Sequence, residues 1–134
     1  MPLLIMLALG AVGVGRVVQG RMALESVSRE AARAAVLSDM PRVGSKGERE
    51  WQVAENRGRA RAQDVANQFG WTSSRLGIEL HARPSFEPSN WVVADAELRI
   101  PINIPIISGI LGEPTVTLHS RHWERIDPFR SRLP

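Results

Sequence analysis

"MPLLIMLALGAVGVGRVVQGR", residues 1–21, opens the chain with fifteen residues that carry no charged side chain, followed by Arg16 and Arg21. Such a stretch is a signal peptide, a buried core helix or a membrane anchor. A secretory signal peptide has a basic segment before its apolar run and a small-x-small cleavage site after it. Only Met1 and Pro2 precede Leu3, and the run leads into further helical sequence. These features argue against a signal peptide.

A membrane anchor is the favoured interpretation of this stretch, and a core helix stays open as the alternative. A domain of about a hundred residues has little structure with which to cover so long an uncharged run. A span needs roughly 20 apolar residues, a length reached only if Val17 and Val18 are counted and Arg16 extends its charge to the interface. We therefore expect several more apolar residues before Met1. The glycines and alanines of the run predict close packing against other helices in lipid.

Composition indicates one compact domain with an appendage. The 134 residues include 17 basic and 14 acidic ones, and Lys46 is the single lysine. No basic block follows a nucleic-acid backbone, and aromatic residues are too few for a stacking platform, so we expect no nucleic-acid partner. Cysteine is absent, which excludes a disulfide framework and a cysteine-ligated zinc site.

Helical periodicity continues beyond the apolar run. Small and aliphatic residues recur at spacings of three and four as far as Ala34, and Pro41 disfavours a helical Met40, so the first helix is expected to end near Ser38 or Asp39. Residues 1–39 are thus predicted as the membrane or filament helix. A second helix is predicted over 48–69, before Gly70 at the position of a C-terminal glycine cap. Contacts with other helices are predicted for one set of residues: Gly10, Gly13, Gly15, Gly20, Leu24, Val27, Ala31 and Ala34.

After Gly70 the period changes to two, which predicts strands over about 76–83, 91–104 and 115–123. The longest, "WVVADAELRIPINIP", alternates apolar and polar residues as a half-buried antiparallel strand does, and Pro101 places its far end at a sheet edge or bulge. The order of elements predicts an α+β fold in which residues 40–134 form a small domain with an antiparallel sheet of about three strands.

The connection "IPIISGILGEP" is apolar for a turn. Its large side chains either fold over the end of the sheet or form a patch that meets a partner or the membrane. The residues that would make this contact are Ile106, Ile107, Ile110 and Leu111.

The sequence offers no candidate for catalysis, for a cofactor or for a metal. His119 and His122 point to opposite faces of a strand, which is poor geometry for one metal ion. Asp95 and Glu97 share a face at strand spacing, yet beside Arg99 they are more simply a charged exterior. No G-x-S-x-G motif occurs, and the glycines of "GAVGVG" lie inside an apolar helix. We therefore expect a protein that is not an enzyme and takes no small-molecule substrate.

Two segments carry a resemblance to a known family. "GRVVQGRMALESVSREAARAAVLSD" resembles the start of TadE-like minor pilins of tight-adherence (Tad/Flp, type IVc) pilus systems, in which an apolar helix ends in a Gly-Arg step and runs into an Ala-Arg-rich stretch. The end, "TVTLHSRHWERIDPFR" after an apolar loop, is similar to the actinobacterial branch of that family. The resemblance covers the first forty and about the last forty residues.

The resemblance implies a pilin-like fold and a minor pilin or pilus-assembly protein, anchored in the bilayer before assembly and packed against other pilins afterwards. It implies a single-pass protein of the bacterial cytoplasmic membrane, with its C-terminal domain outside, or of the surface pilus. Family members carry a basic leader and a glutamate upstream of a proline that Pro2 matches. Arg16 and Arg21 alone would place their flank in the cytoplasm, which a basic leader would offset. The alternative is a membrane-tethered binding or adhesion domain outside any filament.

Overall fold

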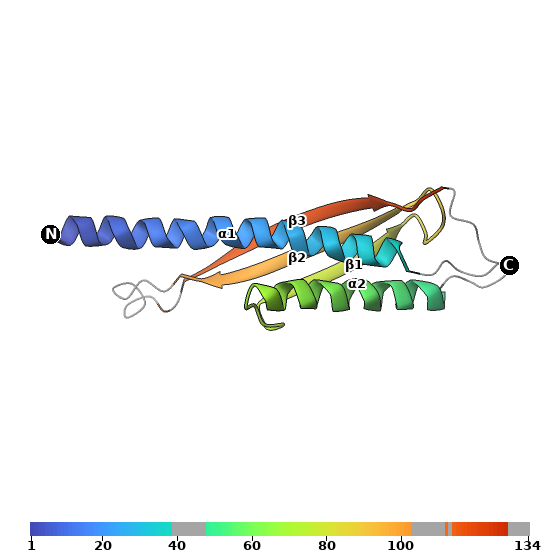
Figure 1. Ribbon diagram of the computed structural model, residues 1–134, viewed down its shortest axis with the longest axis horizontal. Coiled ribbons are helices and arrows are strands. Elements are labelled where there is room, and N and C mark those ends of the chain that lie inside the picture. The colour runs from blue at the N-terminus through green and yellow to red at the C-terminus, as the bar shows by residue number, and fades with distance from the viewer. Residues whose placement is uncertain (39–47, 103–111, 113, 129–134) are drawn as a thin grey trace.

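The computed structural model describes residues 1–38, 48–102, 112 and 114–128. It contains two helices followed by a three-stranded antiparallel sheet, which confirms the predicted α+β fold with its long N-terminal helix (Figure 1). The elements are α1 (Pro2–Val36), α2 (Glu48–Gln68), β1 (Leu76–Arg83), β2 (Trp91–Pro101) and β3 (Thr115–Arg125).

Helix α1 is continuous over 35 residues and begins with Pro2 in its first turn, where the missing backbone N–H costs nothing. It ends at Val36, slightly before the predicted Ser38 or Asp39. The Ser38 hydroxyl donates a hydrogen bond of 2.6 Å to the Ala35 carbonyl oxygen, which satisfies a backbone group that the next helical turn would otherwise use. Asp39 lies outside the described residues.

Helix α2 ends in a glycine cap. Gly70 has φ +76°, and the backbone N–H of Trp71 donates to the Ala66 carbonyl oxygen at 3.0 Å. This pattern is a Schellman motif, which reverses the chain after the helix. The motif brings Trp71 back toward α1 and leads directly into β1.

The sheet has the order β1-β2-β3, with β2 in the centre. Its register pairs Leu80 with Ala94 and Ala96 with Ser120. The structure ends β2 at Pro101, whereas the sequence predicted a strand to residue 104; the Ile102 N–H still donates to the Pro114 carbonyl oxygen at 2.8 Å. Residues 103 and 104 lie outside the described part of the chain. Strand β3 runs two residues beyond the predicted end at 123.

Both helices cover one face of the sheet (Figure 1). Helix α1 lies over β2 and β3, and α2 packs beside α1 and against β1. Alternate residues of β2 and the facing stripe of α1 form the core: Val92, Ala94, Ala96, Leu98, Leu24, Val27 and Ala31 are all buried. A partly buried polar contact lies beside them, where the Ser28 and Ser120 hydroxyl oxygens are 3.0 Å apart.

Val93 is an exception to the alternation, because it is 2% exposed although it belongs to the outer face of β2. Its register partners on that face are His81 in β1 and Trp123 in β3. Trp123 also meets Trp91 edge to face, with ring centroids 6.4 Å apart. These large neighbours surround Val93 and shield it from water without any helix above it.

Candidate membrane and assembly surface

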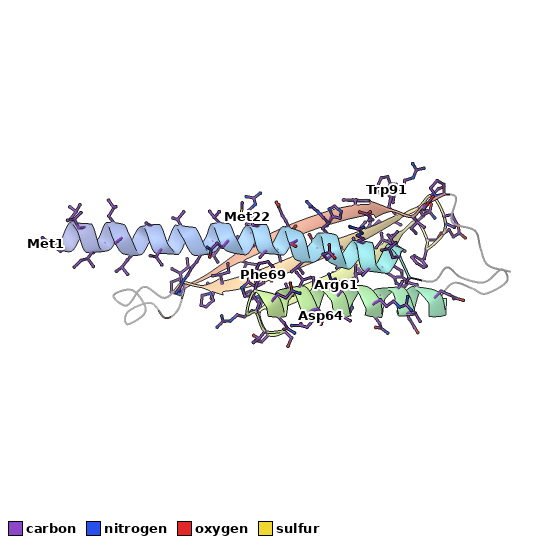
Figure 2. All side chains as sticks on the ribbon, in the orientation of Figure 1. Met1, Met22, Arg61, Asp64, Phe69 and Trp91 are labelled. Carbon is purple, nitrogen blue, oxygen red and sulfur yellow. The ribbon has the colours of Figure 1, made fainter. Side chains whose placement is uncertain are left out.

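The start of α1 extends beyond the sheet, and the end of β2 lies beside only the later part of the first half of this helix (Figure 1). None of residues 1–19 is buried, and large side chains such as Leu3 (76% exposed) and Val14 (65% exposed) face outward. Side chains project around this segment on all sides, from Met1 onward (Figure 2). We call residues 2–19 the bare half of α1.

Helix α1 is the one helix of the described chain that is long and apolar enough to cross a membrane, and 6% of its most apolar 18-residue stretch is buried. A core helix of comparable apolarity would be mostly buried. The structure therefore removes the core-helix alternative that the sequence left open, and the bare half is compatible with a membrane anchor.

The predicted helix-contact residues fall into two groups. Gly20, Leu24, Val27 and Ala31 are buried within this chain, against the sheet and α2, and Ala34 is partly exposed. A Cβ atom added at Gly20 would overlap Ile100 Cδ1 and lie 3.3 Å from Leu118 Cδ1. This group therefore holds the helix to its own domain.

Gly10, Gly13 and Gly15 form the second group and lie on the bare half. A Cβ added at any of the three would meet no described atom within 4 Å. These glycines are free to accept another helix, and their role in assembly stays a prediction. The other predicted contact, Ile106, Ile107, Ile110 and Leu111, lies outside the described residues.

Gly58 in α2 is a packing position that was not among the predicted helix contacts, although its helical spacing places it on the same stripe as Ala54 and Ala62. A Cβ added there would lie 2.9 Å from the Ala31 carbonyl oxygen and 2.6 Å from Leu80 Cδ1. Its neighbours at four-residue spacing, Ala54 and Ala62, are also buried. This small-xxx-small-xxx-small pattern was the signal available in the sequence, since it allows close approach of two helices.

A cavity of about 310 Å³ lies where the bare half joins the domain. Its wall comes from α1, from the turn after α2 and from the end of β2. Phe69, at the end of α2, stands at this end of the domain, beneath α1 (Figure 2). The residues of the wall include Arg16, Gln19, Phe69, Trp71, Arg75 and Arg99. We call this cavity the junction pocket.

The outer face of the sheet carries ion pairs in place of an acid pair. Asp95 accepts two hydrogen bonds from Arg121, including one of 3.2 Å from Nη2, and Glu97 pairs with Arg99 at 3.1 Å. The hydrogen bond and the charge of Asp95 raise the pKa of Arg121 above its ordinary value. Each carboxylate is thus engaged by an arginine, as expected for a charged exterior.

The histidines lie apart. His119 stands opposite Glu97 on the outer face, whereas His122 faces the helices, with its Nε2 atom 3.2 Å from Glu124 Oε2. No group of three or more metal-ligating side chains comes together among the described residues.

Comparison with known proteins gives one match. No curated protein and no solved structure is similar enough to the chain to count as a match. A protein-family model described as "TadE-like protein" matches residues 1–33, which are the bare half of α1 and most of the stripe that packs on the sheet. This part of the chain is therefore similar to TadE-like proteins.

Proposed function

We propose that the protein is a minor pilin or pilus-assembly protein of a Tad/Flp pilus, held in the membrane by the bare half of α1 before assembly. One observation carries the proposal: the segment that matches the TadE-like family is the same helix whose apolar first half is left uncovered by its own domain. The family is one of pilus-associated structural proteins, which agrees with a protein that acts by binding.

The length of the bare half supports an anchor. Its eighteen residues span about 27 Å at 1.5 Å per residue, close to the hydrocarbon thickness of a bilayer of about 30 Å. Arg16 lies near the end of this segment and reaches the headgroup region by extending its side chain. The apolar end of β2, at Ile100 and Pro101, then lies beside the outer part of the anchor, and the rest of the folded domain stands above the membrane surface.

Packing of the bare half against other pilin helices is the proposed mechanism of assembly. A helix that leaves lipid for the interior of a filament stays out of water in both places, so little hydrophobic free energy separates the two states. Contact between helix backbones then decides which partner is chosen, and small residues permit that contact. Gly10, Gly13 and Gly15 are the proposed contact positions, because the remaining buried positions of the stripe are occupied by this chain's own domain.

We place the C-terminal domain outside the cytoplasmic membrane, as the pilus function requires. The arginines after the bare half, Arg16 and Arg21, oppose this orientation on their own. Intact mass and N-terminal sequencing of the native protein test it, because a processed basic leader ahead of Met1 would supply the missing charge.

Fractionation of the producing cells tests the filament role. We expect the protein in the membrane fraction and also in sheared surface filaments, together with other pilins. Recovery from the membrane alone, without other pilins, would overturn incorporation in a filament. The exposed Trp91–Trp123 pair on the outer sheet face would then favour a tethered binding domain.

A matched pair of variants tests the helix contact. Gly13→Leu puts a large side chain on the face of α1 that carries the small-residue stripe. Ile5→Trp is the control, because at about 100° per residue its side chain points roughly 80° or more away from each of Gly10, Gly13 and Gly15. We expect Gly13→Leu to lower the ratio of sheared to membrane-bound protein severalfold, and Ile5→Trp to leave it unchanged. Equal ratios for both variants would contradict packing through the glycines.

A further inference from the structure

The junction pocket brings together cationic and aromatic groups from distant parts of the sequence. Arg16 comes from α1, Trp71 follows the Schellman turn of α2, and Arg75 precedes β1. The Arg99 N–H donates to the Arg75 carbonyl oxygen at 2.9 Å, which fixes this corner of the sheet. Phe69 and Trp71 lie with their ring centroids 5.7 Å apart.

Two of the arginines in the wall lack an acidic partner in the described part of the chain. Neither Arg16 nor Arg75 forms an ion pair with any residue that the structure describes, whereas Arg99 is engaged by Glu97 at 3.1 Å. Guanidinium groups bind phosphate oxygens through paired, charge-assisted hydrogen bonds. The pocket therefore offers a site for an anion, and phosphate fits the chemistry of its donors.

An apolar groove continues from the junction pocket along the bare half of α1. The groove has a volume of about 430 Å³ and shares Arg16, Ile100 and Pro101 with the pocket. The rest of its wall is formed mainly by aliphatic side chains and glycines of α1, among them Leu9 and Gly13. A cationic pocket that opens into an apolar groove matches a ligand with an anionic head and a hydrocarbon tail.

We propose that, before assembly, the junction pocket and this groove bind one anionic phospholipid, with the headgroup phosphate between Arg16 and Arg75 and an acyl chain along α1 where a neighbouring helix packs in the filament. The inference rests on the proposed membrane anchoring, which places the pocket at the level of the headgroups. Phe69 and Trp71 suit that level, because aromatic side chains concentrate at the membrane interface. The bound lipid fixes the domain against the membrane surface next to the anchor.

Thermal unfolding of the full chain in non-ionic detergent micelles tests the site, with phosphatidylglycerol titrated in as the probe. A ligand that binds the folded state raises the unfolding temperature with its concentration. We expect this increase with phosphatidylglycerol, and expect phosphatidylcholine and inorganic phosphate at equal concentration to leave the temperature unchanged. Equal stabilisation by phosphatidylcholine would overturn the headgroup assignment, and equal stabilisation by inorganic phosphate would overturn the lipid assignment.

Matched charge variants locate the site. R16Q/R75Q removes both pocket arginines, and R21Q/R83Q removes the same charge from the same helix and from the other end of β1. We expect the dissociation constant for phosphatidylglycerol to rise about tenfold or more in R16Q/R75Q, the loss that corresponds to one charge-assisted hydrogen bond, and to stay unchanged in R21Q/R83Q. Equal affinity in the two variants would overturn the assignment to this pocket.

Flotation with neutral phosphatidylcholine vesicles separates this inference from the anchoring on which it rests. A chain that floats but does not distinguish phosphatidylglycerol from phosphatidylcholine keeps its anchor and lacks the lipid site. A chain that does not float overturns the anchoring and the lipid site together.

Discussion

At Gly58 the backbone of α2 lies so close to α1 that a methyl group does not fit. The nearest obstacle that cannot rotate away is the carbonyl oxygen of Ala31, 2.9 Å from the position of an added Cβ. Glycine is otherwise a poor helix residue, less favourable than alanine by roughly 1 kcal/mol. Its presence in the middle of α2 therefore reflects the helix crossing and not the helix itself.

Gly58→Ala is expected to lower the free energy of unfolding by about 1–2 kcal/mol, because overpacking outweighs the gain in helix propensity. Gly77→Ala in β1 is the control, since its added Cβ would meet only Glu97 Cβ, at 3.9 Å. Chemical denaturation in detergent micelles measures both. A Gly58→Ala protein as stable as the Gly77→Ala protein would show that the helices can separate at no cost.

The sequence does not predict which individual residues are tightly packed or buried by a neighbouring element. The spacing of Ala54, Gly58 and Ala62 is visible in the sequence, but the helix that crosses there is not. The two-residue period places Val93 on the polar face, yet it is buried, and its register partner Trp123 comes from a strand thirty residues away. Such effects arise from register between strands, which local periodicity does not encode.

At the scale of elements, α1 passes through two environments without a break. No residue of its bare half is buried, although Ile100 and Pro101 of β2 lie beside the later part of it, and from Gly20 onward one face is covered by the sheet and α2. The opposite face of the second half stays exposed, as at Met22 (68% exposed; Figure 2). Periodicity predicted the helix well, because the same stripe of small residues continues through both halves. It could not show where the chain's own domain begins to cover that stripe.

Leu24→Ala tests whether the second half of α1 is core. Leu24 is completely buried, so we expect a loss of about 3 kcal/mol in the free energy of unfolding. Met22→Ala, on the exposed face two residues away, is expected to change stability by no more than about 0.5 kcal/mol. Similar losses in both variants, measured by denaturation in micelles, would indicate that α1 is not held to the sheet as described.

The junction pocket forms only where α1, the turn after α2 and the end of β2 come together. Arg16 and Arg75 are about sixty residues apart in sequence, and each alone reads as an ordinary surface arginine. They line one cavity because β2 extends past the start of β1 and the Schellman turn directs Trp71 into the same corner. The sequence predicted each of these elements, but not their convergence.

The folded core and the proposed membrane anchor lie in different parts of the molecule. The folded domain has its own core, formed by α2, the sheet and α1 from Gly20 onward, and the bare half contributes no buried residue to it. The anchor and the domain therefore share a helix but no buried core. Stability and membrane binding should respond to different parts of the chain.

Removal of residues 1–15 tests this separation. We expect the shortened protein to keep a cooperative thermal transition within about 4 °C of the full chain, since only surface contacts are lost. We expect it to lose flotation with phosphatidylcholine vesicles, because the apolar run is gone. Circular dichroism and flotation measure the two properties. Loss of the cooperative transition would show that the bare half supports the fold.

The continuity of α1 has a rotational consequence. Each helical residue advances the direction of its side chain by about 100°, so the number of residues between Gly13 and Gly20 sets the angle between the direction of Gly13 and the sheet. One residue inserted between them would turn the whole domain by about 100° around the helix axis, with every internal contact preserved. The length of this short stretch thus sets the direction in which the outer sheet face points, relative to the neighbouring helix that Gly13 contacts.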